Sequence, residues 1–149
     1  MSKNVALTDF ACYYNQLTSL DVSNNVALTL LYCDYNQLTS LDVSKNVALT
    51  RFACQSNQLT SLDVSKNVAL THLYCSTNQL MSLNVSNNVV LAEFYCRNNQ
   101  LTTTGLNNLF GTLHSNTIAG GKKIYVGSNP GTSTCSPSIA TSKGWGVYN

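Results

Sequence analysis

The sequence predicts an α/β fold, a right-handed solenoid built mostly from coils with parallel β-strands and ending in a cap with short helices. Three observations predict it. The string Asn-Val-Ala-Leu recurs with a 21-residue period, one cysteine and one asparagine column keep the same period, and apolar residues alternate within each copy. A period of roughly 20–50 residues is typical of solenoids, in which each coil buries its apolar side only against its neighbours.

Five copies of the repeat account for residues 1–101. In each copy a pattern such as Leu31-x-Cys33 places both side chains on one face of a strand, because successive side chains alternate. Stacked coils bring equivalent strands to about 4.8 Å from each other, in a parallel sheet with a buried inner face. An asparagine in the turn after each strand bonds main-chain groups that the sheet leaves unpaired. This first asparagine column contains Asn15, Asn36, Asn57, Asn78 and Asn99.

The second half of each copy nearly repeats the first half. The segment Leu38-Thr-Ser-Leu41-Asp-Val43-Ser-Lys-Asn46 again has the form Leu-x-x-Leu-x-apolar-x-x-Asn. We therefore expect the Leu-Asp-Val segments to form a shorter sheet on the opposite wall. A second asparagine column, expected in the turns after these segments, contains Asn25, Asn46, Asn67 and Asn88.

The repeat resembles a known family. Each copy reads Leu-x-x-[Leu/Phe]-x-Cys-x-x-Asn-Gln-Leu, which resembles the leucine-rich repeat with cysteine in one leucine slot. The nested second half resembles the irregular 21-residue bacterial class of these repeats, the IRREKO type. The resemblance covers residues 4 to about 101 and implies a leucine-rich-repeat solenoid.

Residues 102–149 are expected to form a C-terminal cap of two further coils, continuous with the repeats. The register of the strands carries into it, since Ile124-x-Val126-x-x-Asn129 matches Phe94-x-Cys96-x-x-Asn99. Trp145 and Val147 then follow Ile124 and Val126 by one full repeat period. The main sheet should therefore have about seven parallel strands.

The backs of the cap coils are predicted to be helical. The first predicted helix has Thr103 or Thr104 as N-cap. Its apolar residues lie at helical spacing and are Leu106, Leu109, Phe110 and Leu113. A second helix has Ser136 as N-cap and Pro137 at its first position, and Gly144 ends it. The segment from Asn129-Pro-Gly to Lys143-Gly-Trp-Gly-Val resembles a cap that follows such repeats in Bacteroidetes surface proteins.

The N-terminal end shows no such cap. Ser2-Lys3-Asn4-Val-Ala-Leu repeats Ser65-Lys66-Asn67-Val-Ala-Leu, so the chain begins in the middle of a repeat directly after Met1. We expect the C-terminal part of a longer array; the alternative is a short gene product that tolerates a frayed first coil. The first strand is then an open edge that is able to pair with a second molecule as a dimer.

The composition excludes several function classes. Charged residues make up 9% of the chain and the net charge is +2, so the chain has no basic field for nucleic acid or an anionic membrane. No apolar run approaches the roughly 18 residues of a membrane span. No apolar segment follows the first residues, so the sequence shows no signal peptide. No phosphate-binding glycine loop or catalytic motif is present, and we expect neither enzymatic activity nor a cofactor.

Three residue sets could suggest chemistry, and each has a structural interpretation that we favour. Stacked cysteines one repeat period apart lack zinc spacing and point in parallel, so we expect buried reduced thiols, and a free thiol at Cys135. Asp21, Asp42 and Asp63 could offer oxygen ligands to calcium, but a solvated charge row is the better interpretation. His72 lies in no catalytic motif, and we expect an exposed strand residue.

The copies differ from one another mainly at outward-facing strand positions and in the adjacent turns, where all eight tyrosines lie. Tyrosine offers a large contact area with few rotatable bonds and a polar tip, which suits recognition surfaces. Tyrosine also simply favours strands, so the pattern alone does not require a ligand. The candidate binding residues are Tyr13, Tyr32, Asp34, Tyr35, Arg51, Gln55, His72, Tyr74, Tyr95, Arg97 and Tyr125.

The leading functional hypothesis is a non-catalytic recognition module that binds another protein through this face. The family resemblance implies a bacterial protein on the cell surface or secreted. A carbohydrate-binding surface on the same tyrosines is one alternative. A passive stalk that displays another domain of a larger protein is the other.

Overall fold

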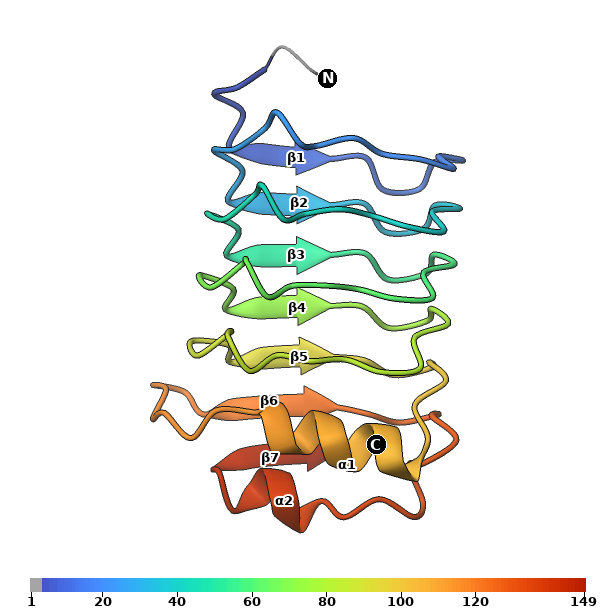
Figure 1. The fold of residues 1–149 in the computed structure, drawn as a ribbon, viewed down its shortest axis with the longest axis vertical. Coiled ribbons are helices and arrows are strands. Elements are labelled where there is room, and N and C mark those ends of the chain that lie inside the picture. Colours follow the sequence, from blue (N-terminus) through green and yellow to red (C-terminus); the bar gives the residue numbers. More distant parts are fainter. Residues whose placement is uncertain (1–3) are drawn as a thin grey trace.

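The computed structural model describes residues 4–149, so Met1, Ser2 and Lys3 of the predicted mid-repeat start lie outside the described residues. Across the described range, seven strands form one parallel sheet in chain order (Figure 1). They are β1 (Asp9–Ala11), β2 (Leu30–Tyr32), β3 (Arg51–Ala53), β4 (His72–Tyr74), β5 (Glu93–Tyr95), β6 (Lys122–Tyr125) and β7 (Trp145–Tyr148). Helices α1 (Thr103–Thr112) and α2 (Ser138–Thr141) belong to the last two coils. The molecule is a parallel β-solenoid, as predicted.

The register of the sheet follows the sequence period. Phe52 pairs with Leu31 on one side and Leu73 on the other, and each partner is one repeat period away. The predicted match of Ile124 with Phe94 is also confirmed, although α1 makes this connection longer than the period. Residues that recur at the repeat period therefore lie one above the other along the solenoid.

The last coil departs from the predicted register. Val147, not Trp145, pairs with Ile124, and Trp145 pairs with Lys122, so the final step exceeds the repeat period by two positions. The indole explains the shift, because its Nε1 donates a hydrogen bond to the His114 main-chain oxygen at 3.0 Å. Trp145 is 2% exposed and takes, in the last strand, the buried position that Lys122 has in β6.

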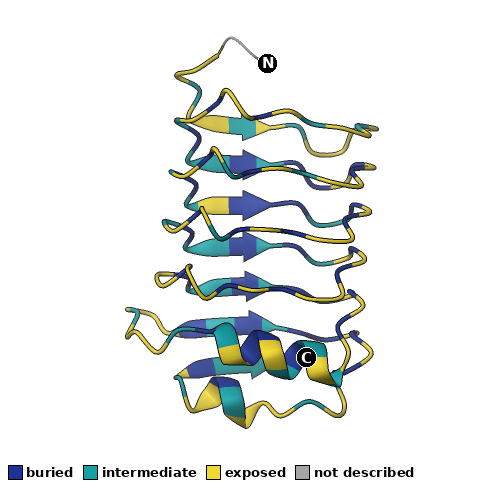
Figure 2. Cartoon of the chain, viewed as in Figure 1, coloured by how far each residue is buried: buried dark blue, intermediate teal, exposed yellow. Residues whose placement is uncertain are grey.

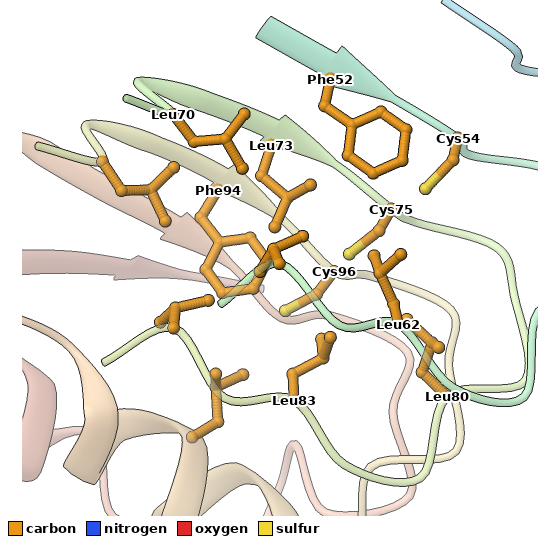
Figure 3. Close-up of a cluster of buried hydrophobic side chains, with 14 of the residues drawn as sticks. Phe52, Cys54, Leu62, Leu70, Leu73, Cys75, Leu80, Leu83, Phe94 and Cys96 are labelled. Atoms are coloured by element: carbon orange, nitrogen blue, oxygen red, sulfur yellow. The ribbon is translucent and has the colours of Figure 1, made fainter. Parts of the chain in front are cut away.

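The core lies between the sheet and the opposite wall of each coil. Inward strand residues are buried along the middle of the sheet (Figure 2). In Figure 3, Phe52, Leu73 and Phe94 point toward leucines of the opposite wall, with the cysteines stacked beside them. Phe10 in β1 is only half-buried, since β1 is the first strand of the sheet.

The first asparagine column joins successive coils. The Asn57 amide nitrogen donates to the main-chain oxygens of Cys33 at 3.0 Å and Cys54 at 3.1 Å, and its Oδ1 accepts from Leu38 N–H at 3.0 Å. One buried side chain thus bonds two coils at the turn after the strand. Asn36, Asn78, Asn99 and Asn129 repeat this arrangement.

The predicted shorter sheet on the opposite wall is wrong, because the Leu-Asp-Val segments form no strand. Their main-chain groups are engaged elsewhere. The Val43 oxygen accepts from Asn46 N–H and from the Asn67 side chain, both at 3.0 Å. Ser44 N–H donates to the Asp42 carboxylate at 2.8 Å. The second asparagine column therefore exists as predicted, but it supplies the inter-coil bonds that a sheet would have made.

Both cap helices begin one residue away from the predicted positions. Thr102, not Thr103 or Thr104, is the N-cap of α1, and its Oγ1 accepts from Gly105 N–H at 3.2 Å. Pro137, not Ser136, is the N-cap of α2, and it has helical dihedral angles and no side-chain cap bond. Gly144 has a φ of +80° two residues beyond the C-cap of α2, in keeping with its predicted role as a stop.

The thiols of the cysteine column are free, and they are buried from the second repeat onward, whereas Cys12 in the first repeat is partly exposed, contrary to the prediction. Cys33, Cys54, Cys75 and Cys96 are fully buried, and burial raises the pKa of Cys75 to about 12. Cys12 and Cys135 are free and partly exposed. Because the thiolate is the reactive form, the four buried thiols should be inert in the native protein.

A thiol count with an aromatic disulfide reagent at pH 8 checks this interpretation. We expect two of the six thiols to react while the protein is native and all six after denaturation in guanidinium chloride. Mass spectrometry of the labelled protein should place both labels on Cys12 and Cys135. Rapid labelling of Cys54 or Cys75 in the native protein would contradict the buried column.

Candidate functional site

The outward positions of the strands bring five tyrosines into one column of the sheet. Within it, Tyr74, Tyr95, Tyr125 and Tyr148 are consecutive register partners on β4 to β7. Tyr32 lies in the same column on β2, separated from Tyr74 by Ala53. Ala53 is 3% exposed, so the column has a gap there. The structure thus divides the predicted face into two aromatic regions.

The first region, here called the tyrosine ladder, consists of Tyr74, Tyr95, Tyr125 and Tyr148. The ring of Tyr95 stacks on Tyr125 with centroids 4.1 Å apart and an interplanar angle of 11°. Tyr74 and Tyr148 extend the stack at 5.1 Å and 5.0 Å. Burial, followed by the neighbouring Tyr125 phenol, raises the pKa of Tyr95 to about 12. The ring faces cover one another, so the ladder presents ring edges and hydroxyl groups.

Arg97 lies beside the ladder. Its guanidinium carbon is 4.9 Å from the centroid of the Tyr125 ring, and Nη2 donates to the main-chain oxygen of Asn149 at 2.8 Å. A cation over an aromatic face is attracted by the ring quadrupole. Arg97 is therefore held in place within the chain, as a fixed positive group at this end of the face.

The second region, here called the N-terminal pocket, is a shallow depression near β1 and β2. Tyr14 and Tyr35 occupy equivalent places in successive coils with φ of 54° and 52°, and their rings stack at 4.2 Å and 8°. The Tyr13 ring is nearly perpendicular to that of Tyr14, at 80°. The pocket is lined by Tyr13, Tyr14, Tyr32, Asp34, Tyr35 and Gln55.

Asp34 is a buried member of the candidate binding residues. It is 8% exposed, and its Oδ1 accepts a hydrogen bond from Gln55 N–H at 3.3 Å. Burial raises the pKa of Asp34 above the ordinary value of a carboxyl group, because desolvation disfavours the charged form. The structure thus places a buried carboxylate among tyrosines.

The remaining candidates lie between the two regions. Arg51 is exposed on β3. His72 is half-buried rather than exposed, since its ring lies beside Tyr74 at 6.2 Å and Nδ1 is 2.8 Å from the Thr71 hydroxyl. The candidate binding residues chosen from the sequence omitted Tyr14 and Tyr148. Both could have been included, because each is a tyrosine at an outward-facing or turn position next to other tyrosines of the same face.

The aspartates in the row on the opposite wall make local hydrogen bonds that stabilise the turns of the chain. Asp21, Asp42 and Asp63 each accept a hydrogen bond from the N–H of the serine two residues later, at 2.8–2.9 Å. The hydroxyl and the N–H of Ser23 lower the pKa of Asp21, and the N–H and hydroxyl of the corresponding serines lower the pKa of Asp42 and Asp63. Within residues 4–149, no group of three or more His, Cys, Asp and Glu side chains is placed to hold a metal ion.

Neither helix of this range has the length and apolar character required to cross a membrane.

Comparison with known proteins identifies the fold. No protein-family model and no curated protein sequence matches the chain. A solved leucine-rich repeat protein of Leptospira interrogans is 26% identical with a TM-score of 0.71, over 91% of this chain and 34% of that one. The leucine-rich-repeat domain of a Shigella effector is 25% identical with a TM-score of 0.62, over 95% and 71%. The chain has the leucine-rich-repeat solenoid fold.

A further leucine-rich-repeat match is the functional domain of InlJ from Listeria monocytogenes, described as including a cysteine ladder. It is 29% identical with a TM-score of 0.49, over 94% of this chain and 38% of that one. The present chain thus spans 38% of the length of the solved Listeria domain and 34% of that of the solved Leptospira chain. The IRREKO class and the Bacteroidetes cap stay predictions.

Proposed function

We propose that this leucine-rich-repeat chain is a non-catalytic recognition module that binds a protein partner through the outer face of its sheet. The tyrosine ladder is the observation that carries the proposal. Solenoids of this kind use extended surfaces for binding, and the compared structures share the fold. The bacterial origin of these neighbours and the family resemblance of the repeats support a place on the bacterial cell surface or in a secreted protein.

The ladder has the chemical character of a protein-binding surface. Its rings are held by mutual stacking, so they lose little further conformational freedom when a partner binds. Their hydroxyl groups can donate to and accept from main-chain groups of a partner, while the ring edges offer apolar contact. Tyrosine and arginine are also the residue types that most often dominate interface energetics.

The stacking favours a protein over a carbohydrate. A sugar ring packs against an exposed aromatic face, but Tyr95 has Tyr74 on one side and Tyr125 on the other. Few free ring faces remain in the ladder. A passive stalk would not need the aromatic surface at all, and the experiment below separates it from a recognition module.

Changing Tyr74, Tyr95 and Tyr125 together to serine should weaken partner binding at least 100-fold, because each truncation removes contact area and a polar tip at the centre of the interface. A partner is first isolated by affinity capture with the wild-type chain. Its dissociation constant is then measured against the wild type and the variant by biolayer interferometry.

The matched control changes the exposed serines Ser40, Ser61 and Ser82 of the opposite wall to alanine and should leave the affinity unchanged. Circular dichroism confirms that both variants are folded. Equal affinity of the wild type and the tyrosine variant would reject the ladder as the binding surface. A glycan array probed with the wild-type chain tests the carbohydrate alternative.

A further inference from the structure

We propose that the N-terminal pocket receives the side chain of a lysine from the protein partner, with the ammonium group at Asp34 and the alkyl stem against the tyrosines. This inference rests on the proposed function and names the chemistry that one end of the binding face recognises. The pocket is distinct from the tyrosine ladder, since β3 with the buried Ala53 lies between β2 and β4.

The carboxylate of Asp34 is the first argument. The side chain is more than nine-tenths buried, at 8% exposure, and it lines the pocket. Only main-chain N–H groups stabilise its charged form, and no cationic side chain of residues 4–149 contributes. A buried carboxylate without a cation is costly. An incoming cation would therefore give the Asp34 carboxylate the positive partner that the chain itself does not supply.

The tyrosines are the second argument. Tyr13, Tyr14, Tyr32 and Tyr35 line the same pocket as Asp34. The Tyr13 ring is nearly perpendicular to the Tyr14 ring, which stacks on Tyr35. Aromatic groups attract cations through the ring quadrupole, and such cages are a known means of holding ammonium groups. Lysine also packs its methylene stem along apolar surface while its charged end reaches a polar group.

The hydrogen-bonding state of Asp34 distinguishes lysine from other cations. Oδ1 already accepts from Gln55 N–H, whereas no other residue of the range 4–149 donates a hydrogen bond to Oδ2. A single available oxygen suits an ammonium N–H donor. A guanidinium group prefers to bond both carboxylate oxygens at once, and a quaternary ammonium has no N–H to donate. The geometry therefore points to a primary ammonium.

Nα-acetyl-lysinamide is the probe that tests the pocket directly. Tyrosine ring signals are followed by NMR while the probe is added to the full chain. We expect saturable shifts at Tyr13, Tyr14, Tyr32 and Tyr35, with a dissociation constant in the millimolar range, and no shifts in the ladder. The neutral norleucine analogue should bind at least fivefold more weakly.

Asp34→Asn should weaken binding of the probe at least fivefold. Asparagine has nearly the same shape and keeps an oxygen for Gln55 N–H, so the variant should fold normally, as thermal unfolding checks. The control Asp63→Asn removes an exposed carboxylate of the opposite wall and should bind the probe like the wild type.

Two results would overturn the proposal: an absence of saturable shifts at the pocket tyrosines, or equal binding by wild type and Asp34→Asn. Tighter binding of choline or of Nα-acetyl-argininamide than of the lysine probe would overturn the assignment to lysine. These failures would leave the proposed function untouched, since the ladder variant contains no pocket residue. A partner that loses affinity with the ladder variant but not with Asp34→Asn would overturn the lysine inference alone.

Discussion

Replacing Asn57 with alanine is expected to lower the free energy of unfolding by about 4 kcal/mol. The substitution leaves the buried Leu38 N–H without a partner, which costs about 1–3 kcal/mol. The Cys33 and Cys54 carbonyls each lose one of two side-chain amide donors and keep the one from Asn36 or Asn78, and each lost hydrogen bond costs about 0.5–1.5 kcal/mol. Urea denaturation followed by circular dichroism measures the change.

Asn15 is a matched control in the same column. It is exposed, and its side chain bonds only to the main-chain oxygens of Cys12 and Tyr13 within its own coil. Asn15→Ala should therefore cost less than about 1 kcal/mol, because water replaces the lost partners. If Asn57→Ala were as mild as Asn15→Ala, the column would not join the coils.

Raising the pH from 8 to 10 is expected to lower the free energy of unfolding by about 7 kcal/mol. Four buried thiols keep their protons in the folded chain, where burial raises the pKa of Cys75 to about 12 and also raises the pKa of Cys54. In the unfolded chain thiols ionise near pH 8.5. The stabilisation is therefore complete below about pH 8 and falls as pH rises toward the folded-state pKa values, because only the unfolded state releases protons.

The number of buried thiols sets how steeply the free energy of unfolding falls as the pH rises from 8 to 10. Cys54→Ala should be less stable at pH 8 because of the cavity it creates, but it should lose about 1.5–2 kcal/mol less between pH 8 and 10. Cys135→Ala should change the slope much less, since that thiol is partly exposed. An unchanged slope in Cys54→Ala would show that the cysteine does not titrate differently in the two states. Denaturant titrations at several pH values give these slopes.

The strand register could be predicted because one 21-residue period carries it through five copies. The inward position of Cys54, the asparagine columns and the shared column of Tyr74 and Tyr95 all follow from that period. The cap was less predictable. Its longer last step depends on the hydrogen bond that the Trp145 indole makes with His114, a contact between distant segments that a local pattern does not encode.

The opposite wall and the site depend on competition among hydrogen bonds. The Leu-Asp-Val segments have the pattern of a strand, but Asn46 and Asn67 take the Val43 carbonyl that a ladder would need. The burial of Asp34 was also unforeseen, because it depends on tyrosines of two coils and on Gln55 from a third. The gap at Ala53, which separates the ladder from the pocket, was not predicted either, because it depends on the burial of that small side chain in the folded chain.

Scalar couplings across hydrogen bonds test the stacking of the coils most directly, and the binding face depends on that stacking. The Cys54 main-chain nitrogen lies 2.8 Å from the main-chain oxygen of Tyr74, and the Cys75 main-chain nitrogen lies 2.8 Å from the main-chain oxygen of Tyr95. NMR should detect couplings between these amide nitrogens and carbonyl carbons, with the Leu106–Thr102 pair in α1 as the internal reference. Detection of the helical coupling without the inter-coil couplings, or couplings at another spacing, would contradict the stacked solenoid and the face built on it.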